Sequence, residues 1–153
     1  MEKAIVIDTS ILLDIIIRTR PRHKFAKLIG AYLIEQGIKV RVPMPALFEI
    51  RSAMLHAKLE AEENGEAVQL NEDISDSTPL IYDTVPIDQA FFEKYFDAGI
   101  PCLKAGDYLY VALAKADGLV LLTEDPAQYE AAGKAGVEVY TAVEYREFCL
   151  ERL

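Results

Sequence analysis

The chain of 153 residues has the length of one domain, and its 52% hydrophobic residues supply a substantial core. No apolar run approaches the roughly 20 residues that a membrane span needs, and no signal-peptide pattern opens the sequence, so we expect one cytoplasmic domain over residues 1–153 with no membrane contact. Two isolated cysteines form no disulfide framework, which favours a reducing compartment. The net charge of −9 argues against a polyanionic ligand only on average, because residues 1–58 alone carry ten Lys or Arg against five Asp or Glu.

The first elements are predicted from a short apolar run and a helical repeat. Residues 4–8 are rich in β-branched side chains and predict a buried strand. A helix over residues 11–17 follows, and Ser10 stands where a helix cap is expected. Pro21 allows a second helix to begin, and Gly37 ends it.

The middle of the chain alternates in the same way. Residues 38–42 alternate as a second strand, and Pro45 introduces a third helix that carries Glu49. The segment 60–76 contains many acidic residues and no Lys or Arg, which predicts a helix tail that runs into a solvated loop. Residues 80–85 then predict a third strand.

The remaining elements complete an alternation of strands and helices. Asp88 introduces one helix, and Asp107 opens another that Gly118 ends. The last four elements are a strand at 119–122, a helix at 126–135, a strand near 137–140 and a helix at 141–151. This order predicts an α/β fold in which helices cover both faces of a parallel sheet.

Four acidic residues stand beside the ends of these elements. Asp8 ends the first strand and Asp125 follows the fourth, while Glu49 and Asp107 lie near helix starts. Because ligand sites of open α/β sheets form outside the carboxyl ends of the strands, we expect the four carboxylates to converge. Clustered carboxylates need a cation, and Mg²⁺ or Mn²⁺ prefers oxygen ligands. The pattern predicts a metal site that hydrolyses a phosphodiester.

Hydroxyl groups accompany two of these carboxylates. Thr9 and Ser10 follow Asp8, and Thr123 precedes Asp125 by two residues. These hydroxyls either orient a ligand or a water molecule, or serve only as helix caps and strand residues. For Ser10 the capping role is at least as well supported as a catalytic one, and the two are compatible.

A basic stretch follows the first predicted helix and contains Arg18, Arg20, Arg22 and Lys24. Such a stretch can steer a nucleic acid even on an acidic protein, because charges beyond roughly 8 Å are screened at physiological salt. We therefore take these four residues as candidate RNA contacts. The alternative is an ordinary solvated helix face.

Other acidic residues fit structural roles better. Asp14 falls inside an apolar helix, where it either faces the site or pairs with a neighbouring arginine. Glu124 is adjacent to Asp125, and the alternation of side chains along a strand directs it elsewhere. Asp83 and Asp88 flank a proline at a turn.

The order of these motifs resembles the PIN-domain ribonucleases, a family that includes the VapC-type toxins of toxin–antitoxin pairs. The resemblance rests on Asp8-Thr9-Ser10, Glu49, Asp107 and Thr123-Glu124-Asp125, and it covers nearly the whole chain. The first motif is weakly specific. The segment 107–125 is much more specific, with its Asp, its Ala-rich helix, its strand and its Thr-x-Asp.

The resemblance implies a three-layer α/β/α fold with a five-stranded parallel sheet. It also implies Mg²⁺- or Mn²⁺-dependent cleavage of RNA by Asp8, Glu49, Asp107 and Asp125, assisted by Thr123 and Ser10. A homodimer is usual in such families, and a toxin would bind a small antitoxin protein. The acidic segment 60–76 has no counterpart in this picture.

Two alternatives compete with a ribonuclease. An α/β phosphatase would use Asp8 as its nucleophile, but the haloacid-dehalogenase pattern needs a second Asp where this chain has Ser10. A receiver domain would need a lysine on the last strand, which has none. A non-catalytic RNA-binding or scaffold module would not need four clustered carboxylates, because unpaired charge destabilises a fold.

Overall fold

A computed structural model describes residues 3–65, 80–97 and 99–152. Five parallel strands form one sheet in the order β3-β2-β1-β4-β5. The strands are β1 (Ala4–Ile7), β2 (Lys39–Pro43), β3 (Tyr82–Val85), β4 (Leu121–Leu122) and β5 (Val139–Tyr140). The prediction of a five-stranded parallel α/β fold is confirmed.

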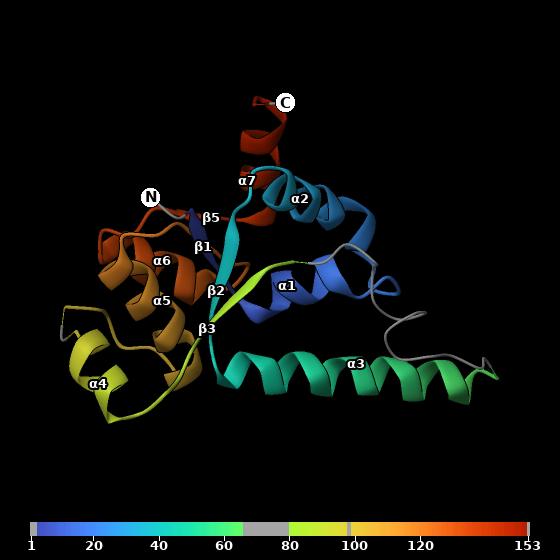
Figure 1. The fold of residues 1–153 in the computed structure, drawn as a ribbon, viewed down its shortest axis with the longest axis horizontal. Coiled ribbons are helices and arrows are strands. Elements are labelled where there is room, and N and C mark those ends of the chain that lie inside the picture. Colours follow the sequence, from blue (N-terminus) through green and yellow to red (C-terminus); the bar gives the residue numbers. More distant parts are fainter. Residues whose placement is uncertain (1–2, 66–79, 98, 153) are drawn as a thin grey trace.

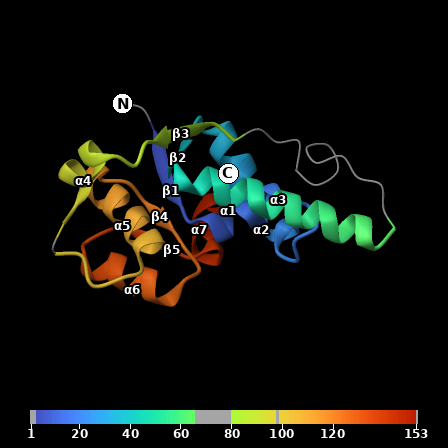
Figure 2. The same cartoon turned by 90° about the horizontal axis from the view of Figure 1, so that it is seen from below.

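Seven helices connect and cover the strands within the described residues. They are α1 (Thr9–Ile16), α2 (His23–Glu35), α3 (Pro45–Glu63), α4 (Gln89–Tyr95), α5 (Ala105–Asp117), α6 (Pro126–Lys134) and α7 (Ala142–Leu150). Helices α4, α5 and α6 lie on one face of the sheet, and α1, α2, α3 and α7 lie on the other (Figure 1). The turned view shows the same three layers (Figure 2). Parallel strands that are covered on both faces explain the near-continuous apolar runs of the sequence.

Strand β1 is the centre of the sheet and of the core. Its residues Ile5, Val6 and Ile7 are buried, and it pairs with β2 on one side and β4 on the other. The backbone N–H of Asp8 donates to the carbonyl of Leu122 at 2.9 Å, so the carboxyl ends of β1 and β4 lie side by side. The residues that follow these two strands therefore meet at one edge of the sheet.

The start of α1 differs from the expectation that Ser10 caps it. The helix begins at Thr9 and Asp8 occupies the cap position, where its side chain makes no capping hydrogen bond. The Asp8 carbonyl instead accepts from the backbone N–H groups of Ile11 and Leu12, each at 3.1 Å. The capping prediction for Ser10 is wrong because β1 passes directly into the helix.

Two further helix ends agree with the expectations. Gly118 has φ 64° after α5, a left-handed conformation that glycine adopts without strain. Helix α3 extends to Glu63, so the expected helix tail is present, while residues 66–76 of the acidic segment lie outside the described residues. None of the described helices is both long and apolar enough to cross a membrane.

Candidate active site

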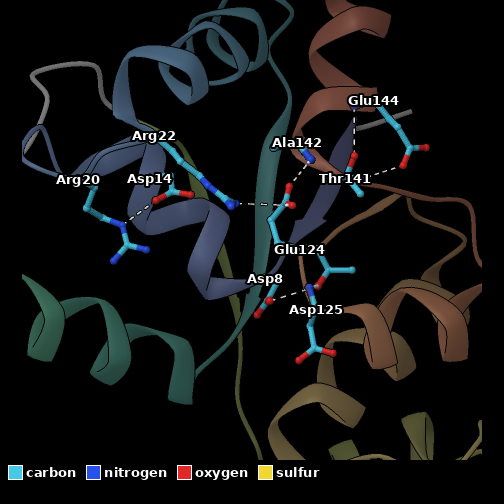
Figure 3. A network of polar contacts seen from close by, with 10 residues as sticks. Asp8, Asp14, Arg20, Arg22, Glu124, Asp125, Thr141, Ala142 and Glu144 are labelled. Atoms are coloured by element: carbon cyan, nitrogen blue, oxygen red, sulfur yellow. Dashed lines mark hydrogen bonds and ion pairs between the residues drawn. The ribbon is translucent and has the colours of Figure 1, made fainter.

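The four carboxylates predicted from the sequence line one open pocket of about 470 Å³. Asp8 follows β1, and Asp125 follows β4 as the cap of α6. Asp107 lies in the first turn of α5, and Glu49 lies near the start of α3. Four elements from distant parts of the chain thus direct acidic side chains to one end of the sheet. Figure 3 shows Asp8 and Asp125 at this end, close together.

The pocket makes ionisation of Asp8 unfavourable. Burial, with smaller contributions from the nearby Asp107 and Glu49, raises the pKa of Asp8 from 3.8 to about 6, although hydrogen bonds from Thr9 and Thr123 oppose the shift. Partial burial also raises the pKa of Asp107, and Asp125 adds to the effect. The carboxylates therefore repel one another across the pocket, and Lys104 offsets the negative charge at Asp107 only in part.

A second layer of polar contacts supports these carboxylates. The Thr123 hydroxyl lies 2.5 Å from Oε1 of Gln128 and 3.3 Å from Oδ2 of Asp8. The backbone N–H of Asp125 donates to the Thr123 hydroxyl at 3.1 Å. Thr123 is fully buried and thus stands behind the pocket, where it is absent from the lining.

Gln128 also belongs to this layer, although the sequence did not identify it as a site residue. Its backbone N–H donates to Oδ1 of Asp125 at 3.0 Å, and its Nε2 donates to the carbonyl of Asp107 at 3.2 Å. The only signal in the sequence is the spacing from Asp125, which is that of a capping box. A capping box, however, would turn the side chain back toward the helix start rather than into the core.

The two hydroxyl residues after Asp8 occupy different environments. Thr9 is buried and its hydroxyl is hydrogen-bonded to the Tyr110 hydroxyl, although the residue also forms part of the pocket lining. Burial raises the pKa of Tyr110 well above its usual range, so this phenol remains neutral. Ser10 is exposed and lines the pocket, and its catalytic role stays a prediction.

One residue of the basic stretch reaches the same pocket. Arg20 lines it, and its Nε donates to Oδ1 of the buried Asp14 at 2.7 Å. Arg22 lies 3.7 Å from Glu124 instead (Figure 3). Arg18 and Lys24 are exposed and do not line the pocket. The structure therefore separates Arg20 from the other three candidate RNA contacts.

The remaining acidic residues have partners elsewhere, as expected. Asp83 accepts from Arg41 at 2.6 Å, and Asp88 caps α4 by accepting from the N–H of Phe91 at 2.8 Å. Glu124 turns away from Asp125 and accepts from the N–H of Ala142 at 2.7 Å (Figure 3). Glu124 also forms part of the pocket lining.

The donors of the pocket suit a hard divalent cation. All four are carboxylates, the ligand type that Mg²⁺ and Mn²⁺ prefer. Within the described residues, no group of three or more His, Cys, Asp or Glu side chains stands ready to hold a metal ion. Mg²⁺ typically keeps several waters and binds only one or two carboxylates directly, so an open pocket fits it better than a closed cage does.

Comparison with known proteins identifies the family. No individual curated protein matches the sequence significantly. The family model of the PIN domain matches residues 5–134, a segment that includes all four carboxylates of the pocket and the Thr123–Gln128 layer behind them. PIN domains are typically nucleases, and they generally use divalent metal ions. With more than half of its length matched, the chain belongs to the PIN domain family.

Proposed function

We propose that this protein is an endoribonuclease that depends on Mg²⁺, or on Mn²⁺ as a substitute, and hydrolyses RNA phosphodiester bonds at Asp8, Glu49, Asp107 and Asp125. The observation that carries the proposal is the convergence of these four side chains on one open pocket. The raised pKa of Asp8, about 6, supports it, because a cation would offset the repulsion that contributes to this shift.

In this proposal the cation and the protein side chains have separate roles. A bound divalent cation supplies polarisation of a phosphoryl oxygen and activation of water. The carboxylates would hold that cation at the edge of the sheet, where the pocket is open to a polynucleotide strand. Ser10 offers an exposed hydroxyl at the rim, and the guanidinium of Arg20 offers a positive group to the phosphate backbone.

The finer biological role is part of the same proposal. The motifs that resemble VapC-type toxins support a toxin of a toxin–antitoxin pair, and the basic stretch from Arg18 to Lys24 supports RNA as the substrate. Such a toxin would act in the cytoplasm as a homodimer and would bind a small antitoxin protein. Growth arrest on expression of the wild type, relieved by coexpression of a small protein encoded beside it, tests this role.

The activity is tested by incubating purified protein with a pool of labelled RNA, or with DNA of matching sequences, in Mg²⁺, Mn²⁺ or EDTA. The Asp107→Asn variant, purified identically, serves as the control for a contaminating nuclease. We expect cleavage of RNA that needs metal and is lost in the variant. Equal cleavage by the variant would contradict the site, and cleavage of DNA alone would contradict the substrate.

A further inference from the structure

Gln128 is a polar side chain with no exposed surface, and all of its side-chain polar atoms have partners at the back of the pocket. Its Oε1 lies 2.5 Å from the Thr123 hydroxyl, and its Nε2 lies 3.2 Å from the carbonyl of Asp107. Its backbone N–H binds the side chain of Asp125. One residue of α6 therefore contacts the end of β4, the start of α5 and a pocket carboxylate.

These contacts fix the direction of the Thr123 hydroxyl proton. An amide nitrogen only donates, so its contact with the Asp107 carbonyl leaves Oε1 of Gln128 as an acceptor toward Thr123. A hydroxyl has one proton, and Gln128 at 2.5 Å is a much closer acceptor than Asp8 at 3.3 Å. The hydroxyl also accepts from the N–H of Asp125, so its bonding capacity is largely used.

A consequence follows for Asp8. With the proton of Thr123 directed mainly to Gln128, Oδ2 of Asp8 receives only the long, weak 3.3 Å contact from this hydroxyl. Its lone pairs remain available to a ligand in the pocket. Removing the Gln128 acceptor would free the hydroxyl to turn toward Asp8 and compete with that ligand.

We propose that Gln128 is a positioning residue of the metal site, acting through Thr123. It keeps the Thr123 hydroxyl turned away from Asp8 and holds the segments that carry Asp8, Asp107 and Asp125 in register. This inference rests on the proposed function, and it assigns to Thr123 a positioning role in place of direct catalysis.

The test measures Mn²⁺ binding by calorimetry in metal-stripped protein, without RNA. The Gln128→Met variant has similar volume but lacks the amide, and Gln89→Met makes the same change at the exposed start of α4. We expect Gln128→Met to weaken Mn²⁺ binding by roughly 10- to 100-fold, the range seen when outer-shell partners are removed, and Gln89→Met to leave it unchanged. Wild-type affinity in Gln128→Met would overturn the proposal.

Variants of Thr123 test whether the effect passes through its hydroxyl. Thr123→Ser keeps the hydroxyl and should bind Mn²⁺ like the wild type. Thr123→Val leaves no hydroxyl to compete at Asp8 but loses the contacts with Gln128 and with the N–H of Asp125, so it should lose affinity, though less than Gln128→Met does. The Thr123→Val/Gln128→Met double variant should bind no more weakly than Gln128→Met alone, since coupled residues are not additive. Additive losses would overturn the coupling.

Two further outcomes are distinguishable. If Gln128→Met does not fold, the comparison of Thr123→Ser with Thr123→Val still decides, and equal Mn²⁺ affinity in those two variants would overturn the proposal. If the wild type binds no Mn²⁺, the proposed function fails and this inference fails with it. Wild-type binding together with an unchanged Gln128→Met variant would overturn the role of Gln128 alone.

Discussion

Helix α5 carries an aspartate at each end, and the two ends differ in how their charge is balanced. Asp117, the last residue of the helix, lies 2.9 Å from Nε of Arg41, and Arg41 also binds Asp83. Asp107, in the first turn, faces the pocket that Asp8 and Asp125 also line. At one end the chain supplies its own cation, and at the other it gathers several carboxylates around one pocket.

The helix dipole alone would favour the charge of Asp107 and disfavour that of Asp117. A carboxylate is favoured at the N-terminus of a helix and disfavoured at the C-terminus. Asp117 is at the unfavourable end, and an arginine compensates it. Asp107 is at the favourable end, yet partial burial and Asp125 raise its pKa. This difference supports the proposal that the acidic residues of the pocket bind an external cation.

The largest expected difference between the two ends is in catalysis. Asp107→Asn should lower RNA cleavage by on the order of 10³-fold, a loss typical of removing one key electrostatic group. The matched Asp117→Asn variant makes the same change at the other end of α5 and should retain cleavage when it is folded. Initial rates of cleavage of labelled RNA compare the two variants. A similar loss in both would contradict the claim that only the Asp107 end of α5 takes part in catalysis.

Stability provides the second contrast. Because the pKa of Asp8 is about 6 in the fold and 3.8 ordinarily, the folded state holds this proton more tightly than the unfolded state does. The contribution of Asp8 to stability therefore falls as the pH rises from about 4 to 6 and remains low above that range. Asp8→Asn should stabilise the metal-free protein at pH 7 by at most about 3 kcal/mol, with no gain below pH 4. Urea unfolding in EDTA from pH 4 to 8 measures this, and equal stabilities at pH 7 would refute it.

The paired end should respond with the opposite sign. Asp117→Asn removes one of the two carboxylate partners of a partly buried arginine, so we expect a loss of about 1 kcal/mol in the free energy of unfolding at pH 7. The same urea experiment measures this loss beside Asp8→Asn. A stabilised Asp117→Asn variant would show that the ion pair with Arg41 is not structural.

The smallest expected effect concerns the basic stretch. Arg20→Ala should weaken RNA binding in EDTA and reduce the slope of log affinity against log salt by about one, because one phosphate contact is lost. Lys24→Ala is the matched control, since Lys24 is exposed and does not line the pocket. Fluorescence anisotropy across a salt series measures both slopes. A larger change of slope for Lys24→Ala than for Arg20→Ala would mean that RNA contacts the outer surface of the basic stretch and not the pocket.

Local patterns were sufficient to predict the order of the elements and the positions of Asp8 and Asp125 after two of the strands. Asp8 and Asp125 follow apolar runs that form parallel strands, and such strands end at one edge of the sheet. The strand order was not predictable, because it depends on pairings between distant segments. Gln128 was missed for the same reason: in the sequence it is an ordinary helix residue after Asp-Pro-Ala, and only the packing of α6 against α5 buries it. The expected cap at Ser10 failed because no residue separates Asp8 from the helix.

The most direct test of the unbalanced pocket is thermal unfolding of the wild type at pH 7 over increasing Mn²⁺ concentration, beside Asp107→Asn. A cation that binds only the folded state at 100 times its Kd adds about 2.7 kcal/mol, which is a rise in Tm of roughly 5–10 °C for a chain of this size. We expect such a rise in the wild type and a much smaller one in Asp107→Asn. A Tm that does not change with Mn²⁺ in either protein would contradict the claim that this pocket is built for a cation.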